Sequence, residues 1–101
     1  MRRLLMAQFT IKEEVLQDFQ AARDKILSAL SQERPKGVRY TWCVMPDERS
    51  FMGLLELDEG IENPLPNLEA GKEFMQHIRG WVAAPPIREE RTVVGSYPSA
   101  A

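Results

Sequence analysis

The sequence has little of what many catalytic and metal-binding sites are built from. Its 101 residues include one cysteine, Cys43, and one histidine, His77. A single cysteine excludes an internal disulfide and a cysteine-based zinc cluster. No pair of histidines or group of carboxylates stands at metal-ligand spacing, and no glycine-rich loop is present that would hold a phosphate. We therefore expect the protein to contain neither a metal nor another cofactor.

An excess of positive charge and long apolar runs are also missing. The formal net charge is −2, with 28% charged residues, so nucleic-acid binding has no electrostatic support. The apolar run near the N-terminus stops at Gln8, which makes it too short for the hydrophobic part of a signal peptide. No stretch approaches the roughly 20 apolar residues of a membrane span. These features predict a soluble, cytoplasmic protein that binds neither nucleic acid nor membrane.

What the sequence does contain is apolar residues at two periodicities. Alternation predicts strands over residues 4–11, 38–45, 51–57 and 92–97, and helical spacing predicts helices over 13–30 and 68–82. The order strand, helix, strand, strand, helix, strand is typical of an α+β, ferredoxin-like βαββαβ fold. We expect a single domain over residues 1–98, with a four-stranded antiparallel sheet, two helices on one face, and a frayed tail at 99–101.

The second and third predicted strands form a hairpin whose register follows from its loop. Residues 46–49 read Pro-Asp-Glu-Arg, which favours a four-residue turn. Antiparallel counting from that turn places Arg39 opposite Glu56 and Trp42 opposite Gly53. One face of the hairpin is then free of charge, and a slip of one residue would mix the two faces. We expect the uncharged face to lie under the helices.

The other face of the hairpin is mixed in character. It carries an ion pair between Arg39 and Glu56 together with Cys43, Met45, Met52 and Leu54. Left in water, these apolar side chains would form an exposed patch of a kind that commonly marks an interface. We therefore expect a homodimer in which this face packs against a second copy of the chain.

Two aromatic residues, Tyr40 and Trp42, lie on the helix-facing side of the hairpin. A glycine opposite Trp42 lets the indole lie flat over the backbone, which is the ordinary way to fill a core. The same pairing can also leave a slot for a flat ligand between sheet and helix. The frequency of aromatic residues in cores favours the first interpretation.

His77 is the only side chain whose ordinary pKa lies near neutrality. Helical spacing places it beside Phe74 and Trp81, at the edge of the apolar stripe of the second helix. It is either a base at the rim of a pocket or a half-exposed residue with no chemical role, and the second is the commoner case. The register argues against a nucleophilic pair of His77 with Cys43, because Cys43 is expected to point to the opposite face of the sheet.

The layout resembles the dimeric α/β-barrel superfamily, and its closing part resembles the antibiotic-biosynthesis-monooxygenase branch. The resemblance covers nearly the whole chain and rests on pattern. The segments that carry it are Phe9 to Ile11, Phe19, Tyr40 to Trp42, Phe51 to Glu56, Phe74 to Trp81, Pro85 to Ile87, and Val93 with Val94.

The resemblance implies a homodimer with a pocket between sheet and helices in each subunit, and a cofactor-independent monooxygenase activity on a small aromatic or quinone-like molecule. We expect the substrate anion to lie against Trp42, Phe74 and Trp81 while His77 or Tyr40 removes its proton. Haem degradation, known in another branch, is disfavoured because that branch needs an asparagine where this chain has Gln8. The alternative is a non-catalytic dimer that binds a ligand or a partner protein.

Overall fold

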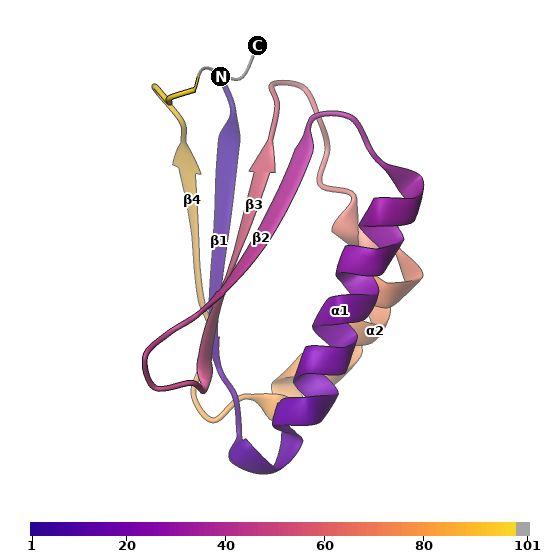
Figure 1. Cartoon of the computed structure of the whole chain (residues 1–101), viewed down its shortest axis with the longest axis vertical. Helices are drawn as coiled ribbons and strands as arrows, with labels where there is room; N and C mark the ends of the chain where they lie inside the picture. The colour runs from indigo at the N-terminus through magenta and orange to yellow at the C-terminus, as the bar shows by residue number, and fades with distance from the viewer. Residues whose placement is uncertain (99–101) are drawn as a thin grey trace.

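A computed structural model describes residues 1–98 and shows an antiparallel sheet with two helices packed on one side (Figure 1). The order of the elements confirms the predicted α+β, ferredoxin-like fold, while the predicted fraying of residues 99–101 lies outside the described residues. The elements are β1 (Arg3–Thr10), α1 (Leu16–Glu33), β2 (Val38–Val44), β3 (Ser50–Leu57), α2 (Glu69–Trp81) and β4 (Ile87–Thr92), with 3₁₀ turns at Glu13–Val15 and Leu65–Asn67.

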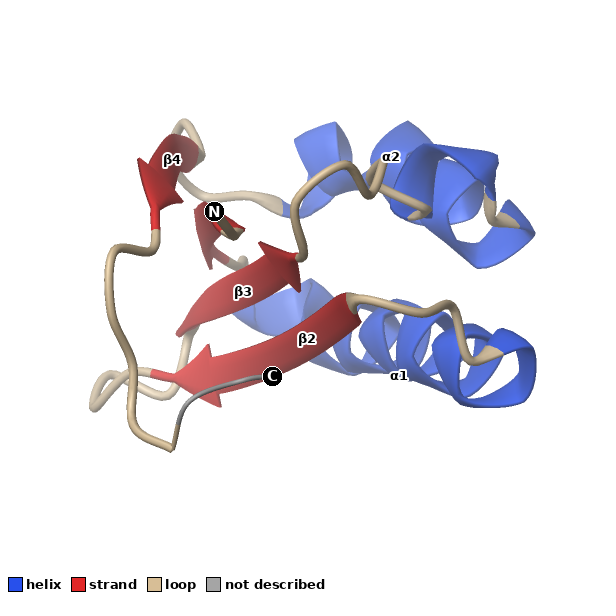
Figure 2. Ribbon diagram, turned by 90° about the horizontal axis from the view of Figure 1, so that it is seen from above, coloured by secondary structure: helices blue, strands red, loops and turns tan. Residues whose placement is uncertain are grey.

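The sheet has the strand order β2-β3-β1-β4, with every neighbouring pair antiparallel. Viewed from above, α1 and α2 lie side by side on the same face, and the other face has no helix over it (Figure 2). Because side chains alternate between the faces of a strand, every second residue of each strand points toward the helices. A cavity on that side is therefore bounded by strands from both halves of the chain.

The predicted register of the hairpin is confirmed. Arg39 pairs with Glu56 and Trp42 with Gly53, and the Arg39 guanidinium lies 3.6 Å from the Glu56 carboxylate. The turn is held by Asp47, whose carboxylate accepts hydrogen bonds from the backbone N–H groups of Arg49 and Ser50 and from the Ser50 hydroxyl. A short polar side chain that caps its own turn explains why the loop length was readable from sequence.

The last strand differs from the prediction. It runs over Ile87–Thr92 and pairs with β1 from Gln8 to Arg3, whereas alternation had suggested residues 92–97. The reason is that β4 is an edge strand on which every residue is exposed. Charged residues on an edge strand discourage pairing with other chains, and they also remove the alternating apolar signal on which the prediction depended.

The core lies between the sheet and the helices. From the helices, Phe19 and Ile26 of α1 and Phe74 and Ile78 of α2 are buried at steps of seven and four residues, which places each pair on one helix face. The strands contribute buried apolar residues from their helix-facing side, namely Phe9, Phe51, Leu55 and Leu57. These contacts fix how far α2 stands from the sheet.

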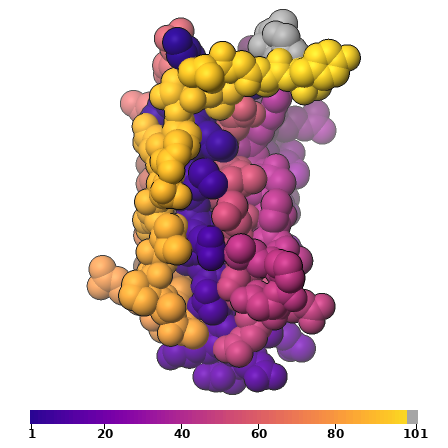
Figure 3. Space-filling view, turned by 90° about the vertical axis from the view of Figure 1, so that its left-hand side faces the viewer, coloured from indigo at the N-terminus to yellow at the C-terminus, as the bar shows by residue number. Residues whose placement is uncertain are grey.

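The helix-free face presents all four strands to the surroundings, with the segment after β4 crossing one end of it (Figure 3). Met52 and Leu54 on this face are half-buried, and Cys43 is exposed. Ile87 of β4 joins the same face with 54% of its surface exposed. Among the described residues, neither helix has the length and apolar character required to cross a membrane, and the expected cytoplasmic location stays a prediction.

Candidate functional site

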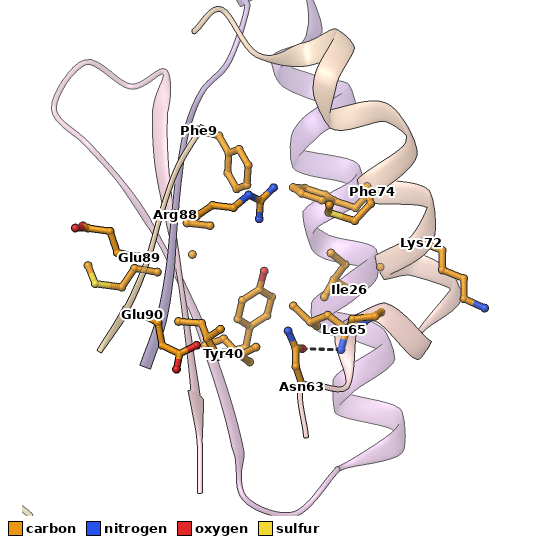
Figure 4. Close-up of a pocket in the computed structure, with 18 residues that line it drawn as sticks. Phe9, Ile26, Tyr40, Asn63, Leu65, Lys72, Phe74, Arg88, Glu89 and Glu90 are labelled. Carbon is orange, nitrogen blue, oxygen red and sulfur yellow. Dashed lines mark hydrogen bonds between the residues drawn. The ribbon is translucent and has the colours of Figure 1, made fainter. Parts of the chain in front are cut away.

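A cavity of about 730 Å³ lies between the sheet and α2. Its walls come from β1, β2, β3 and β4, from α2, from Ile26 of α1, and from the segment at residues 63–66 that leads into α2 (Figure 4). Small-molecule sites in proteins have volumes of roughly 300–1,000 Å³ and mainly apolar walls. The cavity is therefore large enough for a molecule of two or three fused rings.

Aromatic side chains form much of the wall. Phe9 from β1 and Phe74 from α2 meet edge to face, with their ring centroids 5.8 Å apart, and both line the cavity. Each is at least 95% buried, with 2% and 5% of its surface exposed. Buried neighbours hold these rings in place, so the cavity offers a fixed aromatic surface on which a planar molecule can stack.

Tyr40 from β2 points its hydroxyl into the cavity (Figure 4). Burial raises the pKa of Tyr40 from its ordinary 10.0 to about 12, although the neighbouring Trp42 side chain and the positive charge of Arg88 oppose this shift. A phenol with this pKa is neutral at physiological pH. Tyr40 therefore presents a neutral hydroxyl group to the cavity, and a neutral phenol is a poor acceptor of a proton.

Trp42 packs behind the cavity and is not part of its lining. Its ring lies 5.7 Å from those of both Phe19 and Tyr40, centroid to centroid, and 6.1 Å from that of Phe74. The indole lies flat on Gly53, where a Cβ would stand 3.0 Å from two of its carbons. Between the two interpretations left open by the sequence, the geometry favours core filling at Gly53.

His77 and Trp81 lie at the end of α2 away from this space. The two rings stack with centroids 5.4 Å apart at an interplanar angle of 16°. His77 is exposed, Trp81 is half-buried, and neither lines the cavity. Trp81 makes an edge contact with Phe74 of the aromatic wall, with ring centroids 6.4 Å apart. Of the five residues expected at the site, the structure brings Tyr40 and Phe74 into the cavity wall.

Arg88 lines the cavity, and the sequence did not single it out. It stands on β4 opposite Ala7, on the helix-facing side, and its guanidinium carbon lies 5.4 Å from the centroid of the Phe9 ring. Residues 88–91 are Arg-Glu-Glu-Arg, a charged segment without apolar alternation. Recognising them as a strand would have placed alternate residues toward the helices, which is the signal that could have found Arg88.

Asn63 is the other polar residue that sequence reasoning missed. Its Oδ1 accepts a hydrogen bond of 2.9 Å from the backbone N–H of Leu65, and this bond shapes the segment that enters α2. Because the carbonyl end is the acceptor, the side-chain NH₂ group is free to donate. A loop asparagine gives no sequence signal that separates this role from an ordinary turn.

Within residues 1–98 no group of three or more histidine, cysteine, aspartate or glutamate side chains could hold a metal ion. Two acidic residues line the cavity, and both form ion pairs, Glu90 with Arg3 and Glu89 with Arg91. The Glu89 side chain points away from the cavity (Figure 4). Arg3 lowers the pKa of Glu90, which makes this carboxylate a weak base. The cavity can thus bind and orient an aromatic molecule through its apolar walls and a few hydrogen-bond donors.

Comparison with known proteins finds solved structures that resemble this chain. No family model matches the chain, and no curated protein is significantly similar to it. A Mycobacterium tuberculosis protein, Rv0793, superposes with a TM-score of 0.79 at 12% identity, covering 96% of this chain and 99% of that one. An antibiotic biosynthesis monooxygenase gives 0.71 at 14% identity, with coverages of 92% and 99%. A cofactor-independent oxygenase from Streptomyces nogalater gives 0.73 at 13% identity, with coverages of 97% and 98%.

At sequence identities this low, the comparison establishes similarity of fold alone. The matches extend over nearly the full length of both chains, so the similarity includes every strand and helix that bounds the cavity. The resemblance predicted from the sequence is thereby confirmed: the chain has the ferredoxin-like fold of the antibiotic-biosynthesis-monooxygenase-like proteins.

Proposed function

We propose that the protein binds a small aromatic or quinone-like molecule in this cavity and oxidises it with dioxygen, without a cofactor. The observation that carries the proposal is the cavity of about 730 Å³ with Phe9, Tyr40 and Phe74 in its wall. Rigid aromatic walls suit a planar ligand. The choice of reaction is supported by a protein of the same fold that is described as a cofactor-independent oxygenase.

The proposed reaction oxidises an acidic ring methylene. Once deprotonated, the methylene carbon is a resonance-stabilised carbanion that gives its electrons to dioxygen. One oxygen atom becomes the carbonyl of the quinone-like product, and the other leaves as water with the two hydrogens that the ring carbon loses. In this scheme the protein holds the ring against Phe9 and Phe74, excludes water, and offers the Tyr40 hydroxyl to an oxygen of the substrate.

Dioxygen uptake by the purified protein tests this reaction, with anthrone as the substrate probe in chelator-treated buffer. Hydroquinone, which has no ring methylene, is a probe of binding alone. We expect uptake above the rate in buffer alone. Ala7→Phe, which adds a ring to the cavity wall at the centre of β1, is expected to abolish it. Ala21→Phe makes the same change at an exposed position of α1 and is the matched control. Failure of both probes to bind would refute the cavity as a ligand site.

A non-catalytic dimeric module that binds a ligand or a partner protein is the second candidate. It is favoured by one observation: His77 is exposed on α2, outside the cavity lining. Binding of the probes without dioxygen uptake would select this candidate. The role of His77 as a base stays a prediction, and His77→Ala in the uptake assay tests it, since loss of turnover with intact binding would support that role.

We also propose that the helix-free face packs against a second copy of the chain. The half-buried side chains of Leu4, Met6, Met52 and Leu54 support this, because covering apolar surface contributes roughly 25 cal/mol per Å². Light scattering at micromolar concentration should find a dimer. Leu54→Asp is expected to give a folded monomer, and Gln76→Asp, on an exposed position of α2, should leave the dimer intact. A monomeric wild type would contradict the proposal.

A further inference from the structure

Arg88 is an exposed residue of β4 whose guanidinium lies over the buried Phe9 ring in the cavity wall. In Figure 4 the guanidinium extends from β4 toward the helices, and its central carbon lies over the Phe9 ring, 5.4 Å from the ring centroid. Over residues 1–98, no carboxylate comes within ion-pair distance of it. The contact with the ring face orients the guanidinium and leaves its N–H groups free to donate.

The carboxylates beside Arg88 on the same strand are already paired. Glu90 binds Arg3 with a nitrogen–oxygen distance of 3.0 Å, and Glu89 binds Arg91 at 2.7 Å. Glu89 stands opposite Met6, which puts it on the helix-free side of the sheet. The charges of both carboxylates are therefore balanced elsewhere, and Arg88 keeps its positive charge uncompensated.

The other cation in the cavity wall does not compete for this role. Lys72 of α2 points away from the cavity in Figure 4, with its side chain 56% exposed and its ammonium group 4.0 Å from Glu69. A guanidinium fixed over a ring also presents two parallel N–H groups, which match the two oxygens of a carboxylate better than a mobile ammonium does. Arg88 of β4, and not Lys72, is therefore the positive charge that a ligand in the cavity meets.

The remaining polar groups of the cavity are able to donate hydrogen bonds. Asn63 uses its carbonyl oxygen for the backbone of Leu65, so its NH₂ group is the end available to a ligand. The Tyr40 hydroxyl, neutral in this environment, points toward the same space. An electron-rich oxygen on the ligand satisfies such donors, whereas a donating group on the ligand would leave them unpaired.

We propose that the cavity recognises its aromatic ligand as an anion, with a carboxylate or phenolate oxygen bound to Arg88 and the ring packed against the wall that Phe9 and Phe74 form. This inference rests on the proposed function, since it names the class of molecule for the same cavity. The cation in the cavity wall stabilises the charged form of the ligand. A substrate bound as its anion also needs no base in the cavity wall.

Isothermal titration calorimetry with naphthoate and naphthamide tests the proposal. The two probes have the same ring and nearly the same shape, and at neutral pH only naphthoate is charged. We expect wild type to bind naphthoate roughly tenfold to a hundredfold more tightly, as a hydrogen-bonded charge commonly gives. Arg88→Gln is expected to remove this preference while keeping the affinity for naphthamide, and Arg88→Lys is expected to keep part of it.

Arg91→Gln is the matched control. It removes the same charge from the same strand, at a position whose partner in β1 is Leu4 on the helix-free side, and it should leave the preference unchanged. Equal affinities of wild type for the two probes would overturn the anion proposal and leave aromatic binding in the cavity standing. Absence of binding by both would overturn the proposed function as well. An unchanged preference in folded Arg88→Gln would also refute the role of Arg88.

Discussion

Substituting Gly53 by alanine tests the packing on which the back of the cavity depends. Gly53 lies directly opposite Trp42. A Cβ added there would stand 3.0 Å from indole carbons Cη2 and Cζ2 and 3.2 Å from Cε2. Carbon atoms normally approach to about 3.5–4.0 Å, so the indole would have to move by about half an ångström or more. The rings of Phe19 and Phe74 stand close on its other sides and resist that movement.

Two opposing effects set the magnitude. Overpacking of a core costs about 1–3 kcal/mol, while alanine in place of glycine within a strand recovers roughly 0.5–1 kcal/mol of backbone entropy. We expect Gly53→Ala to lower the free energy of unfolding by about 0.5–2 kcal/mol, or the melting temperature by about 4–8 °C per kcal/mol. Gly53→Val should lower the free energy of unfolding further, since its branched side chain places more atoms against the indole.

A double-mutant cycle with Trp42→Phe isolates the contact. Phenylalanine has a smaller ring without atoms at the Cη2 and Cζ2 positions, so alanine at position 53 has more room and should be neutral or stabilising in this background. The coupling energy is therefore expected to be about 1–3 kcal/mol. Urea unfolding followed by far-ultraviolet circular dichroism measures it without depending on the indole fluorescence. All variants are compared at one protein concentration, because association changes apparent stability.

Additive effects of the two substitutions would refute this reasoning. They would mean that the indole does not lie on Gly53 and that the space behind the cavity is available to a ligand after all. A stabilising Gly53→Ala in the wild-type background would lead to the same conclusion.

Three further predictions concern the cavity, its hydroxyl group and the hairpin turn. Gly71→Ala should weaken probe binding in calorimetry, because the added Cβ would collide with the Leu65 carbonyl oxygen and displace the segment that leads into α2; unchanged affinity would count against it. Burial raises the pKa of Tyr40 from 10.0 to about 12, so the folded state holds this proton more tightly than the unfolded state, and stability should fall as pH rises from 10 toward 12. An ultraviolet titration in a Tyr97→Phe background should find Tyr40 ionising above pH 10, and a midpoint below that would contradict the burial. Hydrogen bonds from the turn lower the pKa of Asp47, so Asp47→Ala should melt at a lower temperature near neutral pH, and this difference should shrink as pH falls below the ordinary value of 3.8.

The sequence predicts the part of the candidate site that lies on elements with a regular apolar period. Tyr40 and Phe74 each belong to an element with a clear period, so their direction toward the core followed from counting. Arg88 belongs to β4, where charges on both faces hide the alternation. Asn63 depends on a loop conformation fixed by its hydrogen bond to Leu65. His77 shows the remaining limit, because a residue at the edge of a stripe points inward or outward according to how the helix is rotated.

The sequence by itself determined the element order, the hairpin register and the face that the helices cover, because each follows from local periodicity and from a turn that Asp47 closes. Only the tertiary structure decided where the empty space lies. A cavity is the volume that packed side chains fail to fill, and its walls here come from residues as far apart along the chain as Phe9 and Arg88. The pairing of β4 with β1 places that arginine over that ring, and no local pattern contains this contact.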